Sequence, residues 1–314
     1  MKRVITVLDR KTLGDDISIE KLKDFGELRI YSTTKRNDLE GRIKEADIIV
    51  TNKVVIDKWA MDRALNLKLI CVAATGMNNI DLEYAKKRNI AVKNVKGYST
   101  YSVVQHTFAM LFYLLEKLRY YDMIVKGGIW TKNEIFTCLD RPFHEIRGKR
   151  WGIIGLGEIG LEVARVARSF GCEVVYYSTS GKNDNSEFQR VSLDTLLNSC
   201  DIISIHAPLN EKTKDLIGKE EFSKMKKGVI LLNLGRGGII NEYELANRVS
   251  EGDIYVGLDV LEREPIAKDH PLMYIRNSDN VLITPHIAWT SIEARKRLVD
   301  GIYQNIKTFL EEGK

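Results

Sequence analysis

The sequence lacks a long hydrophobic segment. Apolar runs such as Trp151–Leu156 are far shorter than the roughly 20 residues that a membrane-spanning helix needs. The segment Met1–Asp9 begins with basic residues, but its apolar stretch ends after a few positions, so we expect a β-strand here and not a signal peptide. We therefore expect no membrane partner and a cytoplasmic location.

Cysteine and concentrated charge are also scarce. The four cysteines (Cys71, Cys138, Cys172 and Cys200) form no Cys-x-x-Cys and no Cys/His cluster, so we expect neither a metal site nor a disulfide framework. The 48 basic and 43 acidic residues are spread along the chain and give a net charge of +5. Because nucleic-acid binding needs a focused basic patch, we expect no nucleic-acid partner.

The chain does contain two series of alternating strands and helices, and its 314 residues favour two domains. The expected strands of the first series are Val4–Leu8, Leu28–Tyr31, Asp47–Val50, Leu67–Ala73 and Ile90–Val92. The expected helices between them are Ile19–Phe25, Asp38–Glu45, Asp57–Leu65 and Leu82–Lys87. Such alternation predicts an α/β fold with a parallel sheet.

A longer helix and a second series follow. Apolar residues recur at helical spacing over Tyr101–Tyr121 and cover most of the circumference, which predicts one long helix buried between domains or subunits. The expected strands are then Trp151–Ile154, Glu173–Tyr177, Ile202–Ile205, Val229–Asn233, Tyr255–Leu258 and Val281–Ile283. The expected helices are Ile159–Phe170, Leu193–Asn198, Lys219–Lys224, Glu242–Ser250 and Ser291–Leu310.

A glycine motif marks a dinucleotide site in the second series. The strand Trp151–Ile154 runs into Gly155, Gly157 and Gly160 and then into a helix. The first glycine permits a tight turn, the second lets the backbone approach a pyrophosphate, and the third lets the helix pack closely on the strand. This context favours a nicotinamide dinucleotide over two alternatives, a glycine turn without a ligand and a methyltransferase.

The residues that follow the motif bear on the choice between NAD and NADP. Ser178 directly follows the strand Glu173–Tyr177 and stands where dinucleotide-binding folds place an acidic residue for the adenine ribose. A carboxylate there would repel a 2′-phosphate, whereas serine would not, and Lys182 could attract one. The next acid, Asp184, lies in an expected loop. We expect NAD as the cofactor and keep NADP as the alternative.

Arg236, Glu264 and His286 each follow the end of an expected strand in the second series. In open α/β sheets, ligands bind at this carboxyl edge. Taken singly, the three residues could be a surface arginine, an acid at a helix start and a core histidine. Their joint occurrence in this order favours a catalytic site.

With these motifs, and with His206–Leu209 and Gly128–Trp130, the sequence resembles the D-isomer-specific 2-hydroxyacid dehydrogenase family over essentially its whole length. The resemblance implies two Rossmann-like or flavodoxin-like domains with parallel sheets, the cofactor domain being inserted into the substrate domain. It places the substrate domain at 1–98 and 289–314 and the NAD(P)-binding Rossmann domain at 99–288. It also implies a homodimer formed through the cofactor domain.

The resemblance assigns the chemical roles. Arg236 matches the arginine that binds a 2-keto acid, for which an always-charged guanidinium is suited. His286 matches the general acid/base that supplies a proton when a ketone is reduced. Glu264 matches the acid that orients His286 and favours its protonated form. Asp259 matches the residue that contacts the nicotinamide carboxamide.

Further contacts also follow only from the resemblance. Besides the three glycines, Arg236, Asp259 and His286, cofactor contacts are expected from Val104, Glu158, Ile159, Ser178, His206, Ala207, Pro208, Leu234, Gly235 and Ala288. Substrate contacts are expected from Thr75, Gly76, Met77, Asn78 and Trp289, besides Arg236 and His286. His106, His144 and His270 are expected to be structural or surface residues. Gln105 replaces a frequent Glu outside the catalytic set.

Trp289 would narrow the pocket and favour a short substrate. The whole pattern is closest to hydroxypyruvate reductases, also called glycerate dehydrogenases, so hydroxypyruvate to D-glycerate is the expected reaction and glyoxylate to glycolate the next. A phosphoglycerate-dehydrogenase-like enzyme and an NAD(H)-sensing corepressor-like binding protein are the alternatives. A formate-dehydrogenase-like enzyme is disfavoured because those enzymes lack Glu at the place of Glu264.

Overall fold

The chain folds into two compact units in the computed structural model, which describes residues 2–275 and 278–313. The first unit comprises Met1–Ser99 and Thr290–Lys314, and the second comprises Thr100–Trp289. These bounds lie one residue from those expected from the sequence. The first unit is thus discontinuous in sequence, with the second unit inserted into it.

The first unit contains a five-stranded parallel sheet in the order β2-β1-β3-β4-β5. Its strands are β1 (Val4–Val7), β2 (Glu27–Ile30), β3 (Ile48–Thr51), β4 (Leu69–Val72) and β5 (Ala91–Asn94). Its helices are α1 (Arg36–Ile43), α2 (Lys58–Arg63), α3 (Leu82–Lys87) and α10 (Ile292–Glu311), with 3-10 turns at η1 (Arg10–Leu13) and η2 (Glu20–Phe25). This strand order is the flavodoxin-like one.

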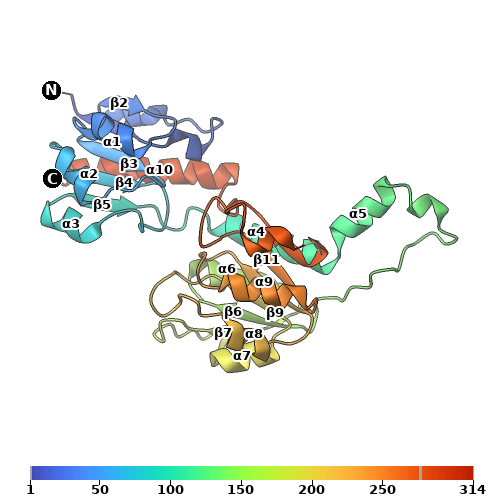
Figure 1. Ribbon diagram of the computed structural model, residues 1–314. Helices are drawn as coiled ribbons and strands as arrows, with labels where there is room; N and C mark the ends of the chain where they lie inside the picture. The colour runs from blue at the N-terminus through green and yellow to red at the C-terminus, as the bar shows by residue number, and fades with distance from the viewer. Residues whose placement is uncertain (1, 276–277, 314) are drawn as a thin grey trace. The chain divides into compact units, whose positions relative to one another are not determined.

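Helix α10 supplies much of the core of the first unit. Its buried side chains recur at helical spacing and are Ala294, Leu298, Val299, Ile302, Ile306 and Phe309. The helix contacts β4 and β5 (Figure 1), and a Cβ atom at Gly301 would lie 2.4 Å from Val95 Cγ1. Helix α10 therefore completes the core of a unit whose strands all lie within the first 99 residues.

The second unit contains a seven-stranded sheet in the order β12-β11-β10-β9-β6-β7-β8. Its strands are β6 (Arg150–Ile154), β7 (Glu173–Tyr177), β8 (Gln189–Arg190), β9 (Ile202–Ile205), β10 (Val229–Asn233), β11 (Ile254–Leu258) and β12 (Val281–Ile283), all parallel. The order reverses between β6 and β9, which is the switch point of a Rossmann fold. The predicted α/β class with two parallel sheets is confirmed.

Helices cover both faces of this second sheet (Figure 1). They are α4 (Thr100–Leu115), α5 (Leu118–Lys126), α6 (Glu158–Ser169), α7 (Leu193–Ser199), α8 (Lys219–Lys224) and α9 (Glu242–Ser250), with 3-10 turns at η3 (Trp130–Lys132), η4 (Pro271–Tyr274) and η5 (Ser278–Asn280). Side chains of α4 and α6 belong to one core cluster, and those of α7, α8 and α9 belong to the other. In the described part of the chain, no helix is long and apolar enough to cross a membrane.

The prediction of one long helix over Tyr101–Tyr121 is wrong. Helix α4 ends at Leu115, and Lys117 adopts a left-handed conformation with φ of 56° before α5 begins. The Lys117 ammonium donates a hydrogen bond to Leu114 O at 2.9 Å and lies 3.3 Å from the ring centroid of Tyr255 on β11. A contact with a distant strand therefore stabilises the break. Two smaller differences are the 3-10 form of η2 and the short strand β8, which the sequence pattern does not indicate.

Helix α5 and the segment after it extend away from the second sheet (Figure 1). Their exposed large apolar side chains are Leu118, Met123, Val125, Ile129, Trp130, Ile135, Phe136, Leu139 and Phe143. Phe136 is 90% exposed and Leu139 is 73% exposed. We call residues 118–143 the arm.

Candidate functional site

The three segments that carry a cation, an acid and a histidine follow neighbouring strands. Strand β10 pairs with β11, and β11 pairs with β12, all parallel. Arg236 follows β10, Glu264 follows β11 and His286 follows β12. Because the carboxyl ends of parallel strands meet at one edge of a sheet, the fold gathers the three segments there.

Glu264 and His286 form a direct pair. His286 Nδ1 lies 2.7 Å from Glu264 Oε2, and the other carboxylate oxygen accepts a hydrogen bond from Leu261 N at 3.1 Å. The side chains are 24% and 33% exposed, so both are accessible from solvent. An ionised carboxylate only accepts hydrogen bonds, so Nδ1 carries a proton toward it. The pairing leaves Nε2 as the ring nitrogen that can exchange a proton with a substrate.

Asp259 organises the turn that presents His286. It is 2% exposed, and its carboxylate accepts hydrogen bonds from Ile287 N at 2.8 Å, Ala288 N at 2.9 Å and Thr284 Oγ1 at 2.7 Å. His286, within this turn, has a φ of 55°, a left-handed conformation that is uncommon for residues other than glycine. The hydrogen bonds to Asp259 stabilise it. Sequence reasoning missed this role, although an acid directly after a strand is a usable signal.

His106 on α4 extends the same network. Its Nε2 lies 3.1 Å from Thr284 Oγ1 and 3.6 Å from Asp259 Oδ1. Burial lowers the pKa of His106, and the Asp259 carboxylate opposes that shift. The residue therefore belongs to the support of the His286 turn.

Arg236 sits on a tightly constrained loop. The Asn233 side chain donates to Arg236 O at 2.9 Å and accepts from Gly235 N at 3.1 Å. A Cβ atom at Gly235 would lie 2.8 Å from Ala207 O, and one at Gly237 would lie within 1.9–2.3 Å of the Leu261–Glu262 peptide. These close approaches require glycine. They fix the loop against the segments that carry Ala207 and Glu264.

The glycine motif has the shape that a pyrophosphate needs. Gly155 has a φ of +91° and packs against the Ala207 backbone, and a Cβ atom at Gly160 would lie 2.2 Å from Gly155 O. By contrast, Gly157 faces open space, with nothing within 4 Å of an added Cβ atom. It begins α6 without a side-chain cap, so the first backbone N–H groups of the helix have no capping side chain. The residues therefore fit an anionic group at this helix N-terminus.

His206 adds an unpaired polar atom at the end of β9, beside the switch point. Trp151 Nε1 donates to Ser204 Oγ at 2.9 Å, and Ser204 Oγ lies 3.0 Å from His206 Nε2. Because the indole can only donate, the serine hydroxyl accepts from it and also pairs with Nε2. Nδ1 is buried and has no hydrogen-bond partner among residues 2–275 and 278–313. Burial lowers the pKa of His206 to about 3.

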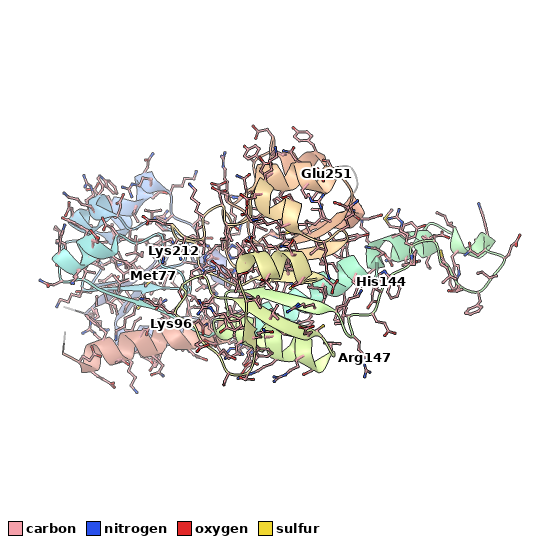
Figure 2. All side chains as sticks on the ribbon, turned by 90° about the horizontal axis from the view of Figure 1, so that it is seen from below. Met77, Lys96, His144, Arg147, Lys212 and Glu251 are labelled. Carbon is pink, nitrogen blue, oxygen red and sulfur yellow. The ribbon has the colours of Figure 1, made fainter. Side chains whose placement is uncertain are left out.

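The other residues expected at the site divide between the two units. Val104, Leu234 and Ala288 share one core cluster of the second unit, and Ala207 is buried in the other. Glu158 accepts a hydrogen bond from Thr100 Oγ1 at 2.6 Å. Ile159 and Trp289 are partly buried, and Pro208 is exposed. The loop with Thr75, Gly76, Met77 and Asn78 belongs to the first unit, where it follows β4; Met77 is labelled in Figure 2.

Thr75 and Asn78 are exposed in this loop, and Thr75 Oγ1 donates to Val95 O at 3.1 Å.

Ser178 is 4% exposed, and its hydroxyl accepts a hydrogen bond from Asn183 N at 3.3 Å. The described residues contain no group of three or more His, Cys, Asp or Glu side chains placed to hold a metal ion.

Comparison with known proteins adds the family. Residues 108–288 match the model of the D-isomer specific 2-hydroxyacid dehydrogenase NAD binding domain. A hydroxypyruvate reductase of Blautia hydrogenotrophica is 37% identical over 98% of this chain and 97% of its own. A glycerate dehydrogenase of Methylorubrum extorquens is 33% identical over 99% and 97%. The D-lactate dehydrogenase of Aquifex aeolicus, solved with NAD and lactic acid, superposes with a TM-score of 0.86 at 29% identity over 99% and 96%.

Proposed function

The chain belongs to the D-isomer specific 2-hydroxyacid dehydrogenase family, and from this premise we propose that it reduces a short 2-keto acid, hydroxypyruvate first and glyoxylate next, to the D-2-hydroxy acid. The family makes it an NAD-dependent oxidoreductase. The observation that carries the proposal is the 2.7 Å pair of Glu264 and His286 at one sheet edge with Arg236.

Each side chain has a role in this reaction. NADH, when bound, supplies the hydride that reduces the ketone. Arg236 binds the carboxylate and the carbonyl oxygen of the substrate, since its planar guanidinium can contact both. His286 donates a proton from Nε2 to that oxygen, while Glu264 on Nδ1 fixes the ring and stabilises its charged form.

The remaining site residues are assigned by the same proposal. The turn at Gly155 and Gly157 receives the pyrophosphate at the start of α6, and Gly160 lets the helix pack closely against that turn. In the same proposal the first unit is the substrate domain and carries residues 75–78, and the second unit is the cofactor domain. The other predicted cofactor contacts keep their assignments, and the buried Nδ1 of His206 is the polar atom assigned to the cofactor there.

NADPH is a second cofactor in our proposal. Ser178 brings no negative charge to the end of β7, and Arg190 on β8 donates to Gly181 O at 3.1 Å in the turn that follows. Lys182 and Arg190 are both exposed beside that turn. Two cations near the place of a 2′-phosphate support its binding. A preference for NADH beyond about 100-fold in kcat/KM would exclude this part of the proposal.

A homodimer formed through the arm is also proposed. The exposed apolar side chains of the arm include Phe136 at 90% and Leu139 at 73% exposure. Monomeric proteins rarely expose such a run of large apolar groups, and a second copy of the same chain would cover it. Light scattering of Phe136→Asp and Leu139→Asp variants tests this, with monomers expected. The cytoplasmic location remains a prediction, which cell fractionation can check.

The deciding experiment for the activity is a steady-state panel. Hydroxypyruvate, glyoxylate, pyruvate, 2-oxoisocaproate and phosphohydroxypyruvate are each tested with NADH and with NADPH. We expect the highest kcat/KM with hydroxypyruvate, because Trp289 narrows the pocket. The highest value with phosphohydroxypyruvate would indicate a phosphoglycerate-dehydrogenase-like enzyme instead. Tight NADH binding without turnover would indicate a dinucleotide-sensing binding protein.

A further inference from the structure

A second acid–histidine pair contacts the chain segment that leads from β11 to Glu264. Glu242 is the first residue of α9 and is only 5% exposed. Its Oε1 accepts a hydrogen bond from Glu262 N at 2.6 Å, and its Oε2 lies 2.9 Å from His270 Nε2. An acid in the first turn of a helix usually remains in solvent, where it interacts with the helix dipole. This carboxylate is instead buried against the chain segment that follows β11.

The hydrogen bonds define the protonation of the pair. His270 Nδ1 accepts a hydrogen bond from Leu272 N at 3.3 Å, at the start of η4. A neutral imidazole has one donor and one acceptor nitrogen, so Nε2 carries the proton and donates to Glu242. Burial raises the pKa of Glu242, as does the Glu262 carboxylate, while Glu262 N–H and His270 oppose the shift. The Tyr243 ring also faces His270, with centroids 6.0 Å apart.

The Leu261–Glu262 peptide that Glu242 binds contacts the Arg236 loop and lies just before Glu264 in the chain. A Cβ atom at Gly237, next to Arg236, would lie within 1.9–2.3 Å of the Leu261–Glu262 peptide. Two residues further along, Glu264 contacts His286. The Arg236 loop therefore passes against the same peptide whose N–H is bound by Glu242. A displacement there would move both catalytic segments.

We propose that Glu242 and His270 are positioning residues for the reaction. They fix the Leu261–Glu262 peptide and so set Glu264 against His286 and beside the Arg236 loop. This inference rests on the proposed function. It gives His270 a role beyond that of a structural or surface histidine. Buried polar networks of this kind are costly unless every donor and acceptor is paired, so the loss of one partner disturbs the whole segment.

The test begins with Glu242→Gln and its matched control Glu244→Gln on the same helix. The amide introduced in place of the Glu242 carboxylate keeps one acceptor oxygen, so either Glu262 N–H or His270 Nε2–H loses its partner. We expect kcat to fall by about tenfold while the Kd for NADH stays within about twofold, since a buried donor is left unpaired away from the glycine motif. The control should retain both values. Unchanged kcat, or kcat and NADH affinity falling together, would overturn the proposal.

A readout independent of turnover separates this inference from the proposed function. NMR titration of His286 in protein with isotope-labelled histidine reports how closely Glu264 approaches the ring. The midpoint should move to lower pH in Glu242→Gln, because a more distant carboxylate stabilises the imidazolium less. An unchanged midpoint refutes the inference. A wild-type protein without turnover refutes the proposed function alone, and the titration still decides this inference.

Two variants of His270 keep the test decisive if Glu242→Gln fails to fold. His270→Gln retains an N–H donor that can bind Glu242, whereas His270→Ala removes it. We expect Ala to lower kcat and shift the His286 midpoint more than Gln does. Equal effects in both measurements would show that the donor to Glu242 does not position the site.

Discussion

His206 should make the second unit sensitive to acid. Burial lowers its pKa from 6.5 to about 3, so the folded protein keeps the ring neutral at pH values where the unfolded chain protonates it. Stability is therefore fully present above pH 6.5 and is lost as the pH falls toward 3. From about pH 7.5 to about pH 5, the linked loss is about 2 kcal/mol at most. It is an upper value because part of the residue remains accessible to solvent.

The perturbation is His206→Gln, which removes the titrating group. Urea unfolding of wild type and variant at about pH 7.5 and about pH 5 gives the free energy of unfolding at each pH. A Trp59→Phe background is useful, because Trp130, Trp151 and Trp289 all lie in the second unit and then report only on its unfolding.

The wild type should lose about 2 kcal/mol more than the variant over this pH interval. His144→Gln is the matched control, since His144 is an exposed histidine of the same unit (Figure 2), and it should leave the pH dependence as in the wild type. Equal losses in wild type and His206→Gln would refute the buried, neutral state of His206.

Four further predictions concern the site. His286→Ala should lower kcat by about 10²–10⁴-fold with a modest effect on the Kd for NADH, and near wild-type turnover would remove His286 from its role. Gly157→Ala should melt like the wild type but bind NADH about tenfold more weakly in a fluorescence titration, because its methyl group fills space for the pyrophosphate. Gly160→Ala should lower the melting temperature, because its Cβ atom meets backbone at 2.2 Å; identical melting of the two variants would contradict this. Ser178→Asp should lower kcat/KM for NADPH by at least about tenfold relative to NADH, since a carboxylate repels a 2′-phosphate, and an unchanged ratio would argue against binding there.

The sequence predicted the strands better than the breaks between elements. Glu173–Tyr177 and Val229–Asn233 match the observed strands, because the inner residues of each form a short apolar run that a parallel sheet buries on both faces. The break at Lys117 could not be predicted, because it depends on the distant ring of Tyr255. Local pattern carries information about burial, whereas this break is decided by a tertiary contact.

The candidate site divides in the same way. Residues with distinctive chemistry, such as Arg236 and His286, could be named from their order along the chain and from the family resemblance. The supporting contacts could not be named. Asp259 holds the His286 turn through two backbone N–H groups and a hydroxyl, and Glu242 reaches a peptide 20 residues away. Such contacts depend on backbone groups, which every residue has, so residue type alone does not reveal them.

The place of helix α10 has a consequence for how the protein is made. The ribosome releases the strands of the first unit early, but Ile292–Glu311 emerges only after the whole of Thr100–Trp289. Until then, the sheet of the first 99 residues lacks the helix whose apolar face packs on β4 and β5. The nascent chain must therefore keep an incompletely folded first unit, with exposed apolar surface, while the inserted unit folds separately. The first unit of this enzyme can therefore finish folding only after helix α10 has been synthesised. A chaperone that shields the early strands should raise the yield of native protein.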